Sequence, residues 1–161
     1  MDYPGEQVAE SLVRAGITHV VWLPDSALGP WETAFDRSSS LDLVRVCREG
    51  EAWAIAAGLC LGGKSPLVMI QNTGLFESGD ALRNVLFDLR LPLLAVIGYR
   101  SYLVPDSTDS ARRFTEPILA AWGLDYILIQ HPDELPKMTA HLQACRQANK
   151  PGVVLVAEGR M

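Results

Sequence analysis

The chain of 161 residues is 48% hydrophobic and 20% charged, which favours one folded domain over residues 1–161 and argues against a disordered chain. Its formal net charge of −5 gives no sign of the basic surface that binds nucleic acid or an anionic membrane. The hydrophobic runs are mostly too short to span a bilayer, and the N-terminus lacks the layout of a signal peptide, so we expect a cytoplasmic protein.

Patterns typical of helices and strands alternate along the chain. Helices are expected at residues 5–15, 30–36, 49–61, 78–89, 114–122 and 133–148. Strands are expected at residues 18–23, 41–46, 66–70, 93–97, 126–129 and 152–156. Residues 71–74 and 98–112 are expected to be loops. This alternation predicts an α/β fold with a doubly wound, mostly parallel six-stranded sheet and helices on both faces.

Ligands of such a sheet bind beyond the carboxyl ends of its strands. Four segments follow directly on predicted strands and carry polar groups, at residues 24–26, 48–51, 71–74 and 98–100. The glycine-rich signatures of dinucleotide and nucleotide sites are missing, as is the nucleophile elbow of hydrolases. The three cysteines and three histidines are scattered along the chain, so we predict no metal ligands.

Glu49 has two interpretations at this stage. It begins an alanine-rich helix, where a carboxylate complements the positive end of the helix dipole, and this structural role is sufficient to explain it. The alternative is a carboxylate on the floor of a cleft that shares a proton with a ligand. Glu51 lies two residues further on, far around the helix, so the two acids cannot face one ligand.

Several segments together resemble the pyrimidine-binding domain of thiamine diphosphate enzymes, above all the alpha subunit of sulfopyruvate decarboxylase and the matching half of phosphonopyruvate decarboxylase. The resemblance extends over most of residues 5–157 and includes the stretches 23–26, 48–58, 62–66, 71–75 and 92–100. It implies the thiamine diphosphate-binding fold of the pyrimidine type and the decarboxylation of a small anionic 2-oxo acid. The cofactor itself is then the electron sink of the reaction.

The resemblance also implies roles for individual residues. A glutamate at the position of Glu49 hydrogen-bonds N1′ of the aminopyrimidine and favours the imino tautomer that removes the C2 proton. The residues expected beside the cofactor are Glu49, Pro24, Asn72, Thr73 and Gly74. The residues expected to face the substrate are Asp25, Ser26 and Arg100. A guanidinium at position 100 suits a carboxylate, sulfonate or phosphonate, although an ordinary exposed loop arginine is the equal alternative.

Two features separate this chain from a complete enzyme of that kind. Phe76, Glu77 and Asp80 depart from the residues of close relatives, and acids there would repel a dianionic substrate. The Gly-Asp-Gly and paired-asparagine signature that holds the diphosphate through Mg²⁺ does not occur. We therefore expect a diphosphate-binding beta subunit to supply that half in a hetero-oligomer. A carboligase of the acetolactate synthase type and a non-catalytic binding or scaffold module are the alternatives.

Overall fold

The computed structural model describes residues 3–23 and 25–159, which contain one six-stranded sheet. The strands are β1 (His19–Trp22), β2 (Asp42–Arg45), β3 (Pro66–Gln71), β4 (Leu94–Tyr99), β5 (Tyr126–Ile129) and β6 (Gly152–Ala157). Their order is β2-β1-β3-β4-β6-β5, and all five neighbouring pairs are parallel. The predicted α/β fold with a six-stranded sheet is confirmed, and the sheet is parallel throughout.

The central strands are buried along their whole length, which explains their composition. Every residue of β3, β4 and β6 is buried, whereas the edge strands β2 and β5 are partly exposed. A strand covered on both faces reads as a continuous run of branched apolar residues instead of an alternating pattern. The sequence shows such runs at residues 67–70, 94–97 and 153–156.

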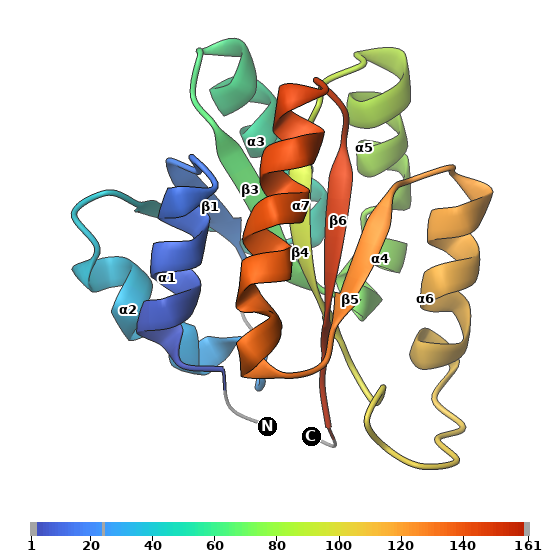
Figure 1. The fold of residues 1–161 in the computed structure, drawn as a ribbon. Coiled ribbons are helices and arrows are strands. Elements are labelled where there is room, and N and C mark those ends of the chain that lie inside the picture. Colours follow the sequence, from blue (N-terminus) through green and yellow to red (C-terminus); the bar gives the residue numbers. More distant parts are fainter. Residues whose placement is uncertain (1–2, 24, 160–161) are drawn as a thin grey trace.

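Helices cover both faces of the sheet and form a separate core on each (Figure 1). One core includes residues of α1 (Gly5–Arg14), α2 (Glu32–Arg37) and α7 (Leu135–Gln147). The other includes residues of α3 (Glu49–Leu61), α4 (Asn72–Glu77), α5 (Gly79–Arg83) and α6 (Ser110–Ala121). Short one-turn helices at Gly29–Trp31, Asn84–Asp88 and Pro132–Glu134 complete the described elements. No helix within these residues is both long enough and apolar enough to cross a membrane.

Both predicted loops differ from the structure. Residues 72–77 form α4, so the segment expected as a loop at 71–74 is mostly the first turn of a helix. Asparagine, threonine and glycine favour turns over helix interiors, and packing against α3 overrides that preference here. The second loop is confined to residues 100–109, because β4 continues to Tyr99 and α6 begins at Ser110, capped by the Asp109 carboxylate.

Candidate active site at the carboxyl edge of the sheet

The carboxyl ends of five adjacent strands bring the candidate residues to one edge of the sheet. Glu49 follows β2, Asp25 follows β1, residues 71–74 end β3 and begin α4, residues 98–100 end β4, and Glu158 follows β6. The connection from β1 to β2 runs in one direction across the sheet, and the connection from β2 to β3 runs back in the other direction. Open sheets bind ligands in the crevice at such a reversal, which here lies between β1 and β3. Pro24, predicted to lie beside a cofactor, is outside the described residues.

Glu49 lies directly over Gly74. A methyl group added at Gly74 would collide with the Glu49 side chain, with Oε1 2.6 Å and Cδ 2.8 Å from the added carbon. Gly74 is buried and Glu49 is half-buried at the first turn of α3. No hydrogen-bond donor to the Glu49 carboxylate occurs within residues 3–23 and 25–159. Two predicted site residues are thus brought together, and the carboxylate keeps its acceptor capacity for a ligand.

Glu51, by contrast, has a structural role. Its Oε2 accepts a hydrogen bond from the backbone N–H of Cys47 at 3.1 Å, and its side chain is exposed. This contact fastens the start of α3 to the segment that follows β2. The expected separation of the two acids is therefore confirmed, and Glu51 provides a matched control for experiments on Glu49.

The acids that depart from the family pattern are paired. Glu77 Oε1 lies 2.6 Å from Arg48 Nη2, and Glu77 Oε2 accepts from the Gly50 N–H at 3.0 Å. The hydrogen bond from Arg48 lowers the pKa of the Glu77 carboxyl. Asp80 pairs with Arg83 at 2.9 Å. The repulsion of a dianionic substrate that was expected from these acids is therefore reduced, because each carboxylate is matched by a guanidinium.

Asn72 and Thr73 point to different surroundings. Asn72 is fully buried, and its Nδ2 donates to Thr115 Oγ1 of α6 at 3.0 Å, while its Oδ1 has no donor within the described residues. Thr73 is exposed and its hydroxyl donates to Gln71 Oε1 at 2.9 Å. Asn72 thus fixes α4 to α6, and Thr73 is the member of the pair that a ligand can reach.

Arg100 is held in place by the loop that follows β4. Its Nε lies 3.0 Å from Asp109 Oδ2, which also accepts from the Ser101 hydroxyl at 2.9 Å. Asp109 Oδ1 accepts from the Ala111 N–H and so begins α6. Burial acts to raise the pKa of Asp109, but these donors and the Arg100 charge lower it. Arg100 is therefore an ordered cation at the rim of a hollow formed by residues 100–101 and 104–110.

Asp25 and Glu158 form a buried acid pair that the sequence analysis missed. Asp25 Oδ1 accepts from the backbone N–H groups of Ala27 at 2.8 Å and Leu28 at 2.7 Å, while Oδ2 is buried without a donor in the described chain. Glu158 is only 5% exposed. A methyl group at Gly98 would collide with Glu158 Oε1 and lie 3.0 Å from Asp25 Oδ2. Both carboxyl groups therefore occupy the space above the Gly98 backbone.

The surroundings of Glu158 favour its protonated form. Burial is the main cause that raises its pKa to about 8, and the Asp25 carboxylate raises it further, against the opposing effects of Arg100 and the Gln71 side chain. Glu158 follows the last strand directly, so the rule that nominated residues after the earlier strands would have found it if extended to β6. Its neighbour Asp25 was predicted to face the substrate.

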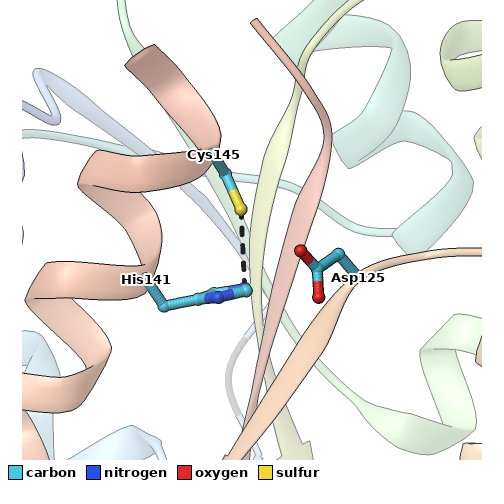
Figure 2. A group of neighbouring side chains, drawn as sticks. All are labelled: Asp125, His141 and Cys145. Atoms are coloured by element: carbon cyan, nitrogen blue, oxygen red, sulfur yellow. Dashed lines mark hydrogen bonds between the residues drawn. The ribbon is translucent and has the colours of Figure 1, made fainter. Parts of the chain in front are cut away.

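A second cluster lies at the opposite, amino edge of the sheet. His141 and Cys145 project from α7 towards Asp125 at the start of β5 (Figure 2). Cys145 Sγ lies 3.6 Å from His141 Nε2, and one ligand atom from each of the three residues lies within 4.8 Å of the others. This set of atoms could hold a metal ion, whereas the sequence analysis predicted none.

The sequence of this chain is similar to those of two kinds of decarboxylase. The chain is 29% identical over 140 residues to phosphonopyruvate decarboxylase from Streptomyces viridochromogenes, an alignment that covers 84% of this chain and 34% of that protein. It is 24% identical over 135 residues to sulfopyruvate decarboxylase subunit alpha from Methanococcus maripaludis, covering 83% of this chain and 81% of that subunit. The chain is similar in sequence to phosphonopyruvate and sulfopyruvate decarboxylases.

A further relative is similar in sequence, and a solved structure is similar in fold. The chain is 36% identical over 96 residues to sulfopyruvate decarboxylase subunit alpha from Methanocaldococcus jannaschii, covering 60% of this chain and 57% of that subunit. It superposes on benzoylformate decarboxylase from Polynucleobacter necessarius with a TM-score of 0.75 at 20% identity, covering 98% of this chain and 30% of that one. The chain spans about a third of the phosphonopyruvate decarboxylases it matches. No family model matches it.

Proposed function

We propose that this chain is the pyrimidine-binding subunit of a two-chain, thiamine diphosphate-dependent decarboxylase of small 2-oxo acids. The observation that carries the proposal is Glu49, a half-buried carboxylate over Gly74 with no donor in the described chain. The similarity to sulfopyruvate decarboxylase subunit alpha along 81% of that subunit supports it, because an alpha subunit is by name one part of an assembly.

The residues at the carboxyl edge fit the aminopyrimidine of the cofactor. When bound, thiamine diphosphate supplies the nucleophilic carbon and the electron sink for loss of CO₂. Glu49 would hold a proton at N1′ of the pyrimidine ring, and the buried Gly74 leaves its side chain room to do so. Thr73, exposed at the start of α4, and the α4 backbone would line the same ring, with Pro24 and Asn72 proposed to support it.

An anionic substrate would meet Asp25, Ser26 and Arg100 on the other side of the crevice. Arg100 supplies a guanidinium whose Nε is fixed by Asp109, so its orientation is set before a substrate arrives. Pre-set orientation reduces the entropy lost on binding. Asp25 would contribute a negative charge next to the reacting group, with Glu158 buried behind it.

A diphosphate-binding beta subunit would complete the site. The Gly-Asp-Gly and paired-asparagine signature expected to hold the diphosphate and Mg²⁺ does not occur in this sequence. Phe114 is 47% exposed and lines a hollow with Thr73 and Phe76 beside α4. An apolar hollow of this kind, next to the residues proposed for the cofactor, suits contact with a partner chain.

The test is 2-oxo acid decarboxylation by this chain purified together with a diphosphate-binding partner chain from the same organism, with thiamine diphosphate and Mg²⁺. The substrates are pyruvate, sulfopyruvate, phosphonopyruvate and benzoylformate, and condensation products are assayed in parallel. We expect activity that needs both chains, falls by orders of magnitude in Glu49→Gln and is retained in Glu51→Gln. Activity that is equal in all three proteins would contradict the proposal, and condensation without aldehyde release would point to a carboligase.

A further inference from the structure

The acid pair at the carboxyl edge of the sheet is not explained by the hydrogen bonds of the described residues. Glu158 is 95% shielded from solvent, since its exposed fraction is 5%, and neither of its oxygens receives a hydrogen bond within the described residues. Asp25 Oδ2 is buried and lacks a donor as well. Two ionised carboxylates in this position would repel each other and leave three buried acceptors without a proton. One proton placed between Asp25 Oδ2 and a Glu158 oxygen removes the repulsion and gives two of these three atoms a hydrogen-bond partner.

We propose that Asp25 and Glu158 share one proton and that Glu158 keeps this proton available at the substrate side of the crevice. Asp25 is the outer member, because it is half-buried and follows β1, whereas Glu158 lies deeper. The Asp25 carboxylate is oriented by the Ala27 and Leu28 N–H groups on Oδ1, which leaves Oδ2 for the proton. Glu158 is therefore a positioning residue that acts through Asp25.

The pair would supply a proton that the proposed reaction consumes. Loss of CO₂ from a 2-oxo acid leaves an electron pair on the 2-oxo carbon, which carried the carboxylate, and one proton must be added to that carbon to release an aldehyde. The shared proton would pass from the pair to that carbon, leaving two carboxylates, and a proton from water would then restore the pair. This role rests on the proposed function, whereas the shared proton itself does not.

The charged groups around Glu158 are consistent with a singly protonated pair. The Asp25 charge faces it from the segment after β1, and Arg100 and the Gln71 amide face it from the ends of β4 and β3. Arg100 is itself paired with Asp109, so its positive charge is partly compensated. One positive and one negative neighbour leave burial as the deciding influence, and burial favours the neutral acid.

The first measurement is carboxyl ¹³C NMR of the full chain with labelled glutamate and aspartate, titrated with pH. Glu158→Gln assigns the signal, and Glu134, whose pKa the Lys137 hydrogen bond lowers to about 2, is the internal contrast. We expect Glu158 to titrate near neutral pH or above, and Asp25→Asn to shift that titration to lower pH. A Glu158 signal that titrates with the ordinary glutamates, or ignores Asp25→Asn, would overturn the shared proton.

The second measurement uses the assembled decarboxylase and asks whether the proton is used. We expect Glu158→Gln to lower kcat at least tenfold, to spare KM, and to remove the fall in kcat on the alkaline side of the pH profile. A variant with the wild-type profile would overturn the role in turnover. If the NMR result stands and no 2-oxo acid is consumed by the wild-type assembly, the proposed function fails and the proton-sharing pair survives.

An independent observation concerns the cluster of Asp125, His141 and Cys145 at the amino edge of the sheet (Figure 2). His141 and Cys145 are four residues apart on α7 and therefore share one face of that helix. Gly152 begins β6 beneath them, and any side chain there would collide with Cys145 Sγ. Asp125 is exposed, which gives its carboxylate freedom to move towards the other two groups.

We infer that these three residues form a site for a single zinc-like divalent ion, with one coordination position left for water. Thiolate, imidazole and carboxylate are the ligands that zinc takes in proteins. Zinc–sulfur and zinc–nitrogen bonds in a tetrahedral site separate the two ligand atoms by roughly 3.5 Å, close to the 3.6 Å between Cys145 Sγ and His141 Nε2.

The other chemistry open to such a trio is nucleophilic catalysis by the cysteine, and the structure argues against it. Burial raises the pKa of Cys145, and Asp125 raises it further, against a smaller opposing effect of Lys150. A cysteine nucleophile needs a lowered pKa and an accessible sulfur. Cys145 is 4% exposed, so a substrate cannot reach its sulfur for nucleophilic attack. A metal ion bound beside it can displace the thiol proton, so metal binding explains this cysteine better than catalysis does.

The test is Co²⁺ binding to the full chain, followed by the thiolate-to-cobalt charge-transfer absorption and by displacement with Zn²⁺. We expect one ion per chain, a band that disappears in Cys145→Ser, and about tenfold weaker binding in Asp125→Asn, whose exposed position leaves folding intact. Cys47→Ser removes an exposed cysteine elsewhere and should leave the band unchanged. Absence of the band, or its survival in Cys145→Ser, would overturn the inference.

Discussion

The buried acid at position 158 makes a quantitative prediction about stability. Raising the pKa of Glu158 from 4.5 to about 8 means that the folded chain binds one more proton than the unfolded chain between these pH values. The free energy of unfolding is therefore highest below pH 4.5 as far as this group is concerned, and falls as pH rises towards 8. A tenfold change in proton affinity corresponds to about 1.4 kcal/mol, so ionising the buried acid above pH 8 would cost roughly 5 kcal/mol.

Glu158→Gln removes this cost while keeping the size of the side chain. We expect the variant to match the wild type near pH 5 and to exceed it by roughly 2 to 4 kcal/mol at pH 8.5, the reduction allowing for water that enters around the ionised acid. Urea unfolding followed by tryptophan fluorescence at a series of pH values measures the difference. The lowered pKa of His141 makes stability rise with pH, but it does so equally in both proteins. Parallel pH profiles for wild type and variant would refute the reasoning.

Three further substitutions, with Gly58→Ala as a control, test the contacts around the site. Gly98→Ala should lower the free energy of unfolding by roughly 1 to 3 kcal/mol, because the new methyl group would collide with Glu158 and contact Asp25. Gly58→Ala, at a helical position with open space around it, should raise the free energy of unfolding by about 0.5 kcal/mol or more. Urea unfolding measures both changes. Ser78→Ala removes the acceptor of Trp53 Nε1 at 2.9 Å and the donor to Gly74 O, and should cost roughly 1 to 3 kcal/mol in the same assay. Gly74→Ala should displace the Glu49 side chain and reduce the rate of decarboxylation by roughly a hundredfold. Circular dichroism should show that the variant is still folded. An unchanged rate would argue against the proposed role of Glu49 beside Gly74.

The parallel sheet could be predicted from the sequence because its signals are local. Runs such as residues 67–70 and 153–156 are apolar without alternation, and the helices between them have their own period. Ligands bind beyond the carboxyl ends of the strands of such a sheet, so the sequence alone was enough to predict Glu49 and Asp25 as site residues. α4 could not be predicted in the same way, because Asn72 and Gly74 favour turns, and the contacts that make them helical come from α3 and α6.

Contacts between segments far apart in the chain could not be predicted from the sequence pattern, because that pattern describes only neighbouring residues. Arg48 and Glu77 are 29 positions apart, and nothing in their local sequences links them, although together they decide whether Glu77 is a free charge. The pairing of Glu158 with Asp25 requires β1 and β6 to end at the same edge of the sheet, so that the two side chains meet over Gly98 at the end of β4. Strand order fixes that proximity, and strand order cannot be read from periodicity.

A buried acid that lowers stability at neutral pH is unexpected in a fold whose central strands are otherwise made of buried apolar residues. Glu158 is 5% exposed and directly follows the fully buried strand β6, where burying an ionised carboxylate without a partner of opposite charge is costly. Among its charged neighbours Asp25 has the largest effect on its pKa and has the same sign, so the pair cannot be explained as a salt bridge that holds the domain together. Local conflicts of this kind concentrate at sites where chemistry needs them. The position of the conflict at the crevice, on the same edge as Glu49, is the reason to seek the function of this chain there.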